Sequence, residues 1–155
     1  MSLPRGQIAV RPAGTHDVPR LCELLFLLFT QEADFEPDRD KQSRALKMIL
    51  QQPDTGRVLC AVDDDTVVGM VSLLFTVSTA EGGRAAWLED LVVHPSRRGR
   101  GVGEQLLNAA ITEAQGAGCL RVTLLTDSDN DAAHRLYVRA GFARSKMLPL
   151  RLKFR

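Results

Sequence analysis

The sequence predicts a mixed α/β fold whose elements follow in the order β-α-α-β-β-β-α-β-α-β. Some stretches alternate apolar and polar residues, as strands do, and the stretches between them space their apolar residues as helices do. The length of 155 residues suits one domain, which can bury a core without a metal or a disulfide. Hydrophobic residues at 45% and charged residues at 25% are typical of globular proteins and exclude a disordered or collagen-like chain. We therefore expect residues 1–155 to form a single domain.

Two helices are expected after a first strand at Gln7–Arg11. Thr15 and Asp17 offer capping oxygens to the first helix. The apolar stripe of that helix consists of Val18, Leu21, Leu24, Leu25, Leu28 and Phe29. A second helix is expected from about Asp40 to Gln51, because Pro53 disfavours helical backbone in the residue before it.

Runs rich in β-branched residues predict the next strands. Val58–Val62 and Val67–Val77 form a hairpin around Asp63-Asp64-Asp65, and three aspartates suit a turn better than a metal site. Gly69 inside the second run suggests a bulge or a close approach of the backbone. A further strand is expected at Ala85–Val93.

The last third of the chain predicts a helix, a strand, a helix and a strand. One face of the first helix consists of Val102, Leu106, Leu107, Ala110, Ile111 and Ala114. Gly116 and Gly118 end it, and a strand follows at Leu120–Leu125. Asn130–Ala140 reads as a helix that ends at Gly141. Leu148–Phe154 alternates in polarity, which predicts a last strand near a sheet edge.

Charge and cysteine usage favour a cytoplasmic protein. The net charge of +1 argues against a chain built mainly to bind nucleic acid. The cysteines lie far apart and form no CxxC pair, as expected of buried thiols in a reducing compartment. We see no secretory signal, and Leu21–Phe29, the longest apolar stretch, is too short for a membrane span. After Asp131 the chain carries seven basic residues and no acidic one, which indicates a solvated surface or a polyanionic ligand.

A glycine-rich turn between a strand and a helix is the most informative stretch. The strand stops at Pro95, and the helix begins near Gly101. The alternating glycines are Gly99, Gly101 and Gly103, and the neighbouring arginines are Arg97, Arg98 and Arg100. Such glycines let backbone N–H groups converge on an anion, and the positive end of the helix adds to the attraction. The stretch therefore predicts a phosphate cradle, with a tight turn that binds nothing as the alternative.

Two common phosphate motifs do not fit this turn. A GxxxxGK[ST] loop fails because Gly99 is followed five residues on by Glu104. The pattern GxGxxG fails because the third glycine comes one residue early. Any phosphate that this turn binds would therefore belong to another kind of ligand.

The spacing Arg98-x-x-Gly101-x-Gly103 after Leu91-Val92-Val93 resembles the acetyl-CoA-binding motif of the GNAT superfamily of N-acetyltransferases. A second block looks like the next one of that family: Asn130-x-x-Ala133-x-x-Leu136-Tyr137-x-x-x-Gly141-Phe142. The resemblance covers nearly the whole chain and is weakest before Val58. It implies a single mixed, mostly antiparallel sheet with a central splayed parallel pair, flanked by about four helices.

The resemblance also implies which residues bind acetyl-CoA. Amides from Arg98 to Gly103 would hold the pyrophosphate, and the backbone of Leu91 and Val93 would pair with the pantetheine arm. Asn130 would orient that arm, and Tyr137 would protonate the CoA thiolate as it leaves. The full expected set is Leu91, Val92, Val93, Arg98, Gly99, Arg100, Gly101, Val102, Gly103, Asn130 and Tyr137.

The chemistry implied by the resemblance requires a proton acceptor. Thioester aminolysis needs a neutral amine, but alkylamines are mostly protonated near pH 7. Strict alternation would put Glu89 on the same strand face as Leu91 and Val93, and Asp90 on the other. A Glu-Asp pair here also resembles the spermidine/spermine N-acetyltransferases. We expect Glu89 to act as the base through water, or to hold the amine's cation, with Asp90 or no single base as alternatives.

The acceptor is expected to be a small primary amine. Glu32 lies in an acidic segment where the family has a variable helix-loop region, and with Glu89 and Asp90 it would favour a cationic substrate. Direct attack in a ternary complex is expected, because Cys60 and Cys119 have no neighbouring activating group. The alternatives are a protein or peptide N-terminus or lysine as the acceptor, and a non-catalytic module that binds acyl-CoA.

Partners other than the two substrates are few in this interpretation. No metal is expected. Homodimers are common in the family, with the C-terminal strand as the expected contact. Nucleic acid is not expected, since the basic tail offers few aromatic side chains for stacking. No membrane partner is expected either.

Overall fold

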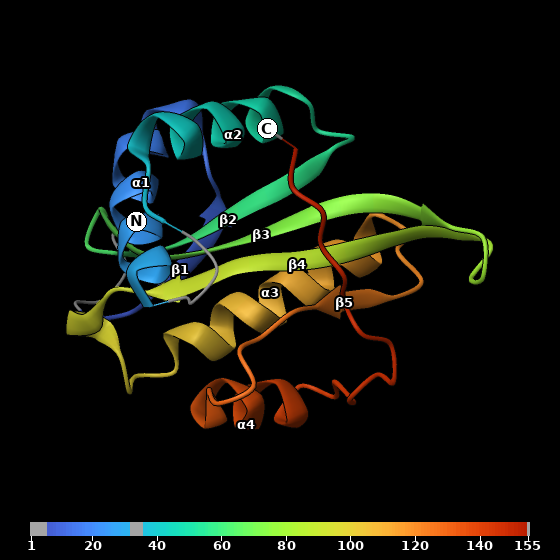
Figure 1. The fold of residues 1–155 in the computed structure, drawn as a ribbon. Helices are drawn as coiled ribbons and strands as arrows, with labels where there is room; N and C mark the ends of the chain where they lie inside the picture. The colour runs from blue at the N-terminus through green and yellow to red at the C-terminus, as the bar shows by residue number, and fades with distance from the viewer. Residues whose placement is uncertain (1–5, 32–35, 155) are drawn as a thin grey trace. The chain divides into compact units, whose positions relative to one another are not determined.

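The computed structural model describes residues 6–31 and 36–154 (Figure 1). The chain divides into two compact units, one up to Leu125 and one from Thr126 onward. The prediction of a single domain over residues 1–155 stays a prediction. Within the described ranges, no helix is both long and apolar enough to cross a bilayer.

The first unit contains a five-stranded sheet in the order β1-β2-β3-β4-β5. The strands are β1 (Ala9–Pro12), β2 (Gly56–Asp63), β3 (Thr66–Ser78), β4 (Gly83–Val93) and β5 (Val122–Leu124). Neighbours from β1 to β4 are antiparallel, and β4 and β5 are parallel. The predicted mixed, mostly antiparallel sheet with one parallel pair is confirmed.

Helices cover both faces of this sheet (Figure 1). The helices of the first unit are α1 (Val18–Gln31), α2 (Arg39–Gln51) and α3 (Val102–Gly116), with short 3-10 turns η1 (Thr15–Asp17) and η2 (Pro95–Arg97). α1 and α2 lie on one face and α3 on the other (Figure 1). Asp38 caps α2 by accepting a hydrogen bond from the Lys41 amide. Asp17 instead accepts from the Gly14 amide and pairs with Arg11, so it closes the turn before α1.

The predicted helix stripes form the core. The layer under α1 and α2 consists of Val18, Leu21, Cys22, Leu24, Leu25, Leu46, Val58, Cys60, Val67, Met70 and Val92. The buried face of α3 consists of Val102, Leu106, Leu107, Ala110 and Ala114. Fully burying one such leucine contributes roughly 1.5–3 kcal/mol, so the two apolar layers hold the sheet in place.

The β2–β3 hairpin turns at Asp64 and Asp65, whose φ angles are 45° and 68°. Aspartate tolerates this left-handed backbone, so the aspartates serve the predicted turn. The predicted close approach at Gly69 is confirmed, because a Cβ there would lie 2.9 Å from Leu106 Cδ1 and 3.1 Å from the Val92 carbonyl oxygen. The pairing of β2 with β3 also shifts register beside Gly69.

The second unit holds α4 (Asp131–Arg139) and a tail. Asn130 caps the helix, and Gly141 follows its end with a φ of 103°. The predicted strand at Leu148–Phe154 is wrong, since these residues adopt no strand. Their apolar side chains are strongly exposed, Leu150 at 97% and Phe154 at 92%. Alternation alone cannot make a strand, because the backbone needs a partner for its hydrogen bonds, and Pro149 lacks a donor.

Candidate functional site

β4 and β5 separate after a short parallel pairing. Their register joins Ala86 with Val122 and ends where Leu88 meets Leu124. β4 continues to Val93, and among the described residues of the first unit no strand pairs with this edge from Glu89 onward. Unpaired backbone at a strand edge can bind an extended ligand as an added strand. The parallel pair implied by the resemblance is therefore present, but in the described sheet it lies at the edge and not at the centre, because β5 is the outermost strand.

A β-bulge lies in this open part of β4. β3 and β4 pair Ser72 with Glu89 and then Met70 with Val92, so two β4 residues, Asp90 and Leu91, oppose a single β3 residue. Asp90 has a φ of 54°, in the left-handed region. Met70 and Ser72 share one face of β3, so Glu89 shares a face with Val92 and not with Val93. The prediction from strict alternation is wrong here, because the extra residue shifts the period.

Asp90 is partly buried, next to the fully buried Ser72. Ser72 is 1% exposed. Its hydroxyl lies 3.2 Å from Asp90 Oδ2 and 3.1 Å from the Glu89 carbonyl oxygen, so it can donate a hydrogen bond to either. The pKa of Asp90 is raised to about 6: burial contributes most, the negative charge of Glu89 adds to it, and the Ser72 hydrogen bond opposes both effects. A carboxyl group with this pKa can exchange a proton near neutral pH. The polar Ser72 in an otherwise apolar run was the signal that the sequence reasoning missed.

Glu89 has a different environment. Its side chain is exposed, and it forms no hydrogen bond or ion pair with another described residue. Trp87 lies two residues earlier on the same strand face and is 38% exposed. Glu89 can therefore meet a solvent-borne cation, whereas Asp90 is shielded.

The glycine-rich loop follows β4 directly. His94 accepts a hydrogen bond from the Ser96 amide and so caps η2, which gives this histidine a structural role. Gly99 and Gly101 have φ angles of 75° and 77°. An added Cβ would meet nothing within 4 Å at either position, so these glycines serve the backbone conformation rather than close packing.

α3 begins at this loop with an uncapped turn. Its N-cap residue is Gly101, which has no side chain to accept from the first amides of the helix. The first helical hydrogen bond runs from the Gln105 amide to the Gly101 carbonyl oxygen, so the amides of Val102, Gly103 and Glu104 have no acceptor within the helix. Together with the left-handed glycines, this uncapped turn suits a phosphate group.

The three arginines of the loop differ in what they contact. Arg97 Nε donates to Asp63 Oδ2 at 2.7 Å, and Arg98 Nε donates to the Val93 carbonyl oxygen at 3.2 Å. Arg100 is exposed and has no side-chain partner among the described residues. Its charge is therefore available to an anion. Sequence reasoning treated Asp63 only as a turn residue, and no local pattern links it to Arg97.

Two predicted site residues belong to the second unit. Asn130 Oδ1 accepts a hydrogen bond from the Ala133 amide, which leaves its NH₂ group as the donor for a ligand. Tyr137 lies on α4, with its ring centroid 5.9 Å from that of Phe142 in an edge-on arrangement. His134 Nε2 lies 2.8 Å from the Asp127 carbonyl oxygen, which suits a structural role. The expected roles of Asn130 and Tyr137 in binding and catalysis stay predictions.

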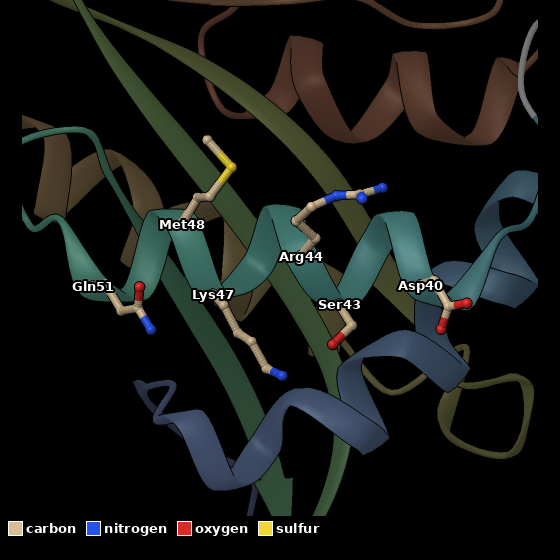
Figure 2. Close-up of a pocket in the computed structure, with 6 residues that line it drawn as sticks. All are labelled: Asp40, Ser43, Arg44, Lys47, Met48 and Gln51. Atoms are coloured by element: carbon tan, nitrogen blue, oxygen red, sulfur yellow. The ribbon is translucent and has the colours of Figure 1, made fainter.

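The acceptor region is described only in part. Glu32 lies outside the described residues. A hollow of about 410 Å³ follows the exposed side of α2 (Figure 2) and is lined by Asp40, Ser43, Arg44, Lys47, Met48 and Gln51. None of these residues belongs to the open edge of β4 or to the glycine-rich loop. This hollow therefore has no link to the predicted site.

The cysteines do not suit a covalent mechanism. Burial raises the pKa of Cys60 to about 11, and it also raises the pKa values of Cys22 and Cys119. The reactive thiolate is thus scarce at neutral pH.

Comparison with known proteins identifies the family. Residues 18–142 match the family described as Acetyltransferase (GNAT) family, so the chain belongs to it. The chain is 32% identical over 136 residues to the aminoalkylphosphonate N-acetyltransferase of Salmonella typhimurium, covering 88% of this chain and 85% of that protein. It is 32% identical over 87 residues to the glucosamine 6-phosphate N-acetyltransferase of Trypanosoma brucei brucei, covering 56% of this chain and 57% of that protein.

A solved structure supports the same conclusion. A putative acetyltransferase from Agrobacterium tumefaciens superposes with a TM-score of 0.79 at 30% identity, over 93% of this chain and 99% of that one. The protein is therefore an acyltransferase that depends on acetyl-CoA, and the predicted GNAT fold is confirmed.

Proposed function

We propose that this protein transfers the acetyl group of acetyl-CoA to the primary amine of a small molecule, by direct attack in a ternary complex. The observation that carries the proposal is the open, bulged edge of β4, which joins a shielded carboxyl group at Asp90 to the glycine-rich loop. The matched relatives named for small amines support the same substrate class.

The cosubstrate would be held by backbone groups. The amides from Arg98 to Gly103 would bind its diphosphate, with Arg100 as the available side-chain cation. The backbone of Leu91, Val92 and Val93 would pair with the pantetheine arm along the edge that β5 leaves open. Asn130 would hold the arm through its NH₂ group.

The proton of the incoming ammonium would pass to Asp90, directly or through one water. We favour Asp90 over Glu89, the residue that the sequence favoured, because the pKa of Asp90 lies near 6 and its carboxylate is held by Ser72. Glu89 would instead attract the ammonium from solvent. The acetyl thioester supplies the carbonyl carbon that the neutral amine attacks.

Tyr137 would complete the transfer. As the carbon–nitrogen bond forms and the carbon–sulfur bond breaks, its phenol would donate a proton to the departing thiolate. A phenol with an ordinary pKa of about 10 is protonated at neutral pH and suits this role. No acyl-enzyme is needed, and the raised pKa values of the cysteines support a direct route.

Two classes of amine are candidates for the acceptor. The relatives are named for an aminoalkylphosphonate and for glucosamine 6-phosphate, which are amines that carry an anionic group. The acidic residues in the sequence, Glu89 and the segment from Glu32 to Glu36, favour instead a cationic amine such as a polyamine. We place the phosphonate- or phosphate-bearing amine first, because the first relative matches over most of both chains.

Thiol release from acetyl-CoA would test the proposal. The panel comprises 2-aminoethylphosphonate, glucosamine 6-phosphate, spermidine, an aminoglycoside and short peptides with free N-termini or lysines. Turnover on a small amine supports the proposal, and the best acceptor decides between the two classes of amine. Turnover on peptides alone would favour a protein acetyltransferase, and tight acetyl-CoA binding with no turnover on any acceptor would favour a binding module. A homodimer and a cytoplasmic location stay predictions.

A further inference from the structure

We infer that Asp63 is a positioning residue for cosubstrate binding, which acts through Arg97 to hold the glycine-rich loop in its diphosphate-binding shape. The inference rests on the proposed role of that loop. Asp63 itself would touch neither substrate. It would fix the backbone that leads to Gly99 and Gly101.

The contact between Asp63 and Arg97 is short and shielded. Arg97 Nε lies 2.7 Å from Asp63 Oδ2, and the Asp63 side chain is only 9% exposed. Arg97 Nη1 also donates to Ser96 Oγ at 3.1 Å, inside the same η2 turn. One guanidinium group therefore ties η2 to the end of β2. Ion pairs that are shielded and hydrogen-bonded are the ones that hold a geometry.

The end of β2 is a firm anchor. Asp63 pairs with Thr66 across the two-residue turn of the hairpin. The His94 amide donates to the Val68 carbonyl oxygen at 2.7 Å, which fixes the start of the loop to β3. Among the described residues, the side chain of Arg97 forms the hydrogen bond that connects η2, beyond Pro95, to this hairpin. Loss of it would free the segment before Gly99.

The sign of the effect separates positioning from simple electrostatics. Asp63 carries a negative charge close to a loop that would bind a diphosphate. If Asp63 acted only through its charge, its neutralisation would strengthen anion binding, because a repulsion is removed. If it acts by holding Arg97, its neutralisation weakens binding, because the loop must be ordered when the ligand arrives.

Asp63→Asn and Asp64→Asn form a matched pair of variants. Each removes one negative charge from the same end of the hairpin, but among the described residues Asp64 forms no hydrogen bond or ion pair with the loop, and its left-handed φ of 45° suits asparagine. Binding of acetyl-CoA to the full chain would be measured by calorimetry, and kcat and KM with the best acceptor of the panel. We expect Asp63→Asn to raise the Kd and the KM for acetyl-CoA at least fivefold, with kcat and the acceptor KM within twofold of wild type. Asp64→Asn should leave the Kd unchanged or lower it.

Arg97→Lys gives a second test, because it changes the more exposed partner of the contact and leaves the buried Asp63 in place. It keeps the charge but replaces the fork of donors with a single ammonium group. We expect a Kd for acetyl-CoA raised at least threefold, and little further loss when Asp63→Asn is added, because both changes weaken the same contact. A Kd for Asp63→Asn equal to that of Asp64→Asn, or an unchanged Kd for Arg97→Lys, would overturn the inference. Absence of acetyl-CoA binding by the wild-type chain would instead overturn the proposed function.

Discussion

The hydroxyl of Ser72 lies 3.2 Å from the carboxylate of Asp90, across the point where β3 and β4 lose their regular pairing. The bulge turns Asp90 into a left-handed conformation and leaves its carboxyl group shielded from water. Ser72 is then the hydrogen-bond donor that stabilises the charged form. The pair gives β4 a titratable group beside the backbone edge that β5 leaves open.

The pH dependence of the reaction should report on this pair. Asp90 accepts a proton only when ionised, so we expect kcat/KM to fall as the pH drops through about 6. Ser72→Ala removes the hydrogen bond that lowers the pKa, so the acidic limb should move to higher pH. Asp90→Asn should lower kcat/KM at least a hundredfold and abolish the limb. Profiles of kcat/KM for an acceptor that carries no group titrating between pH 5 and 7 would check this.

Glu89→Gln is the control for that experiment. It removes the neighbouring charge that raises the pKa of Asp90, so the limb should move slightly to lower pH while turnover persists. Loss of the limb in Glu89→Gln, with Asp90→Asn still active, would return the role of base to Glu89.

Asp90 should also cost the protein stability at neutral pH. Its pKa rises from 3.8 in the unfolded chain to about 6 in the fold, so the fold prefers the protonated form. Ionisation of Asp90 therefore costs the fold on the order of 3 kcal/mol as the pH rises from about 4 to about 6. We expect Asp90→Asn to be more stable than wild type at pH 7.5, by about 1–3 kcal/mol, and similar to it at pH 3.5. Urea unfolding at the two pH values would measure this, and a less stable variant at pH 7.5 would contradict the assignment.

Local periodicity was sufficient to predict most of the fold. The stripe of α1 and the alternation in β2 and β3 are set by neighbours a few residues away, so their bounds differ from prediction by only a few residues. The bulge at Asp90 could not be predicted in this way, because it depends on how β4 pairs with β3 and not on the order of polar and apolar residues.

Contacts between distant residues were the other limit. Asp63 and Arg97 are 34 positions apart, and a turn rich in aspartate looks the same whether or not an arginine reaches it. At Leu148–Phe154 the sequence pattern predicted a strand that the structure does not contain. Its alternation describes a chain that is able to form a strand, but a strand also needs a neighbour with free backbone groups.

Tyr137→Phe tests the proposed acid. The substitution removes the phenolic proton donor and keeps the ring that packs edge-on against Phe142. We expect kcat to fall at least tenfold, about 1.4 kcal/mol of barrier, with the Kd for acetyl-CoA changed less than threefold. Steady-state kinetics would measure kcat, and calorimetry would measure the Kd. An unchanged kcat would mean that the thiolate leaves without protonation by this residue.

Gly101→Ala tests whether the loop binds through its backbone shape. Gly101 has a φ of 77°, whereas Gly116 at the end of α3 has no positive φ, and an added Cβ meets nothing within 4 Å at either position. Alanine at position 101 must adopt a left-handed conformation, which costs roughly 1–2 kcal/mol, or distort the turn that presents the first amides of α3. We expect Gly101→Ala to raise the Kd for acetyl-CoA about tenfold, while Gly116→Ala leaves the Kd unchanged and the thermal midpoint equal or higher. Since both variants add the same methyl group in open space, equal affinities would show that the conformation of Gly101 plays no part in binding the diphosphate.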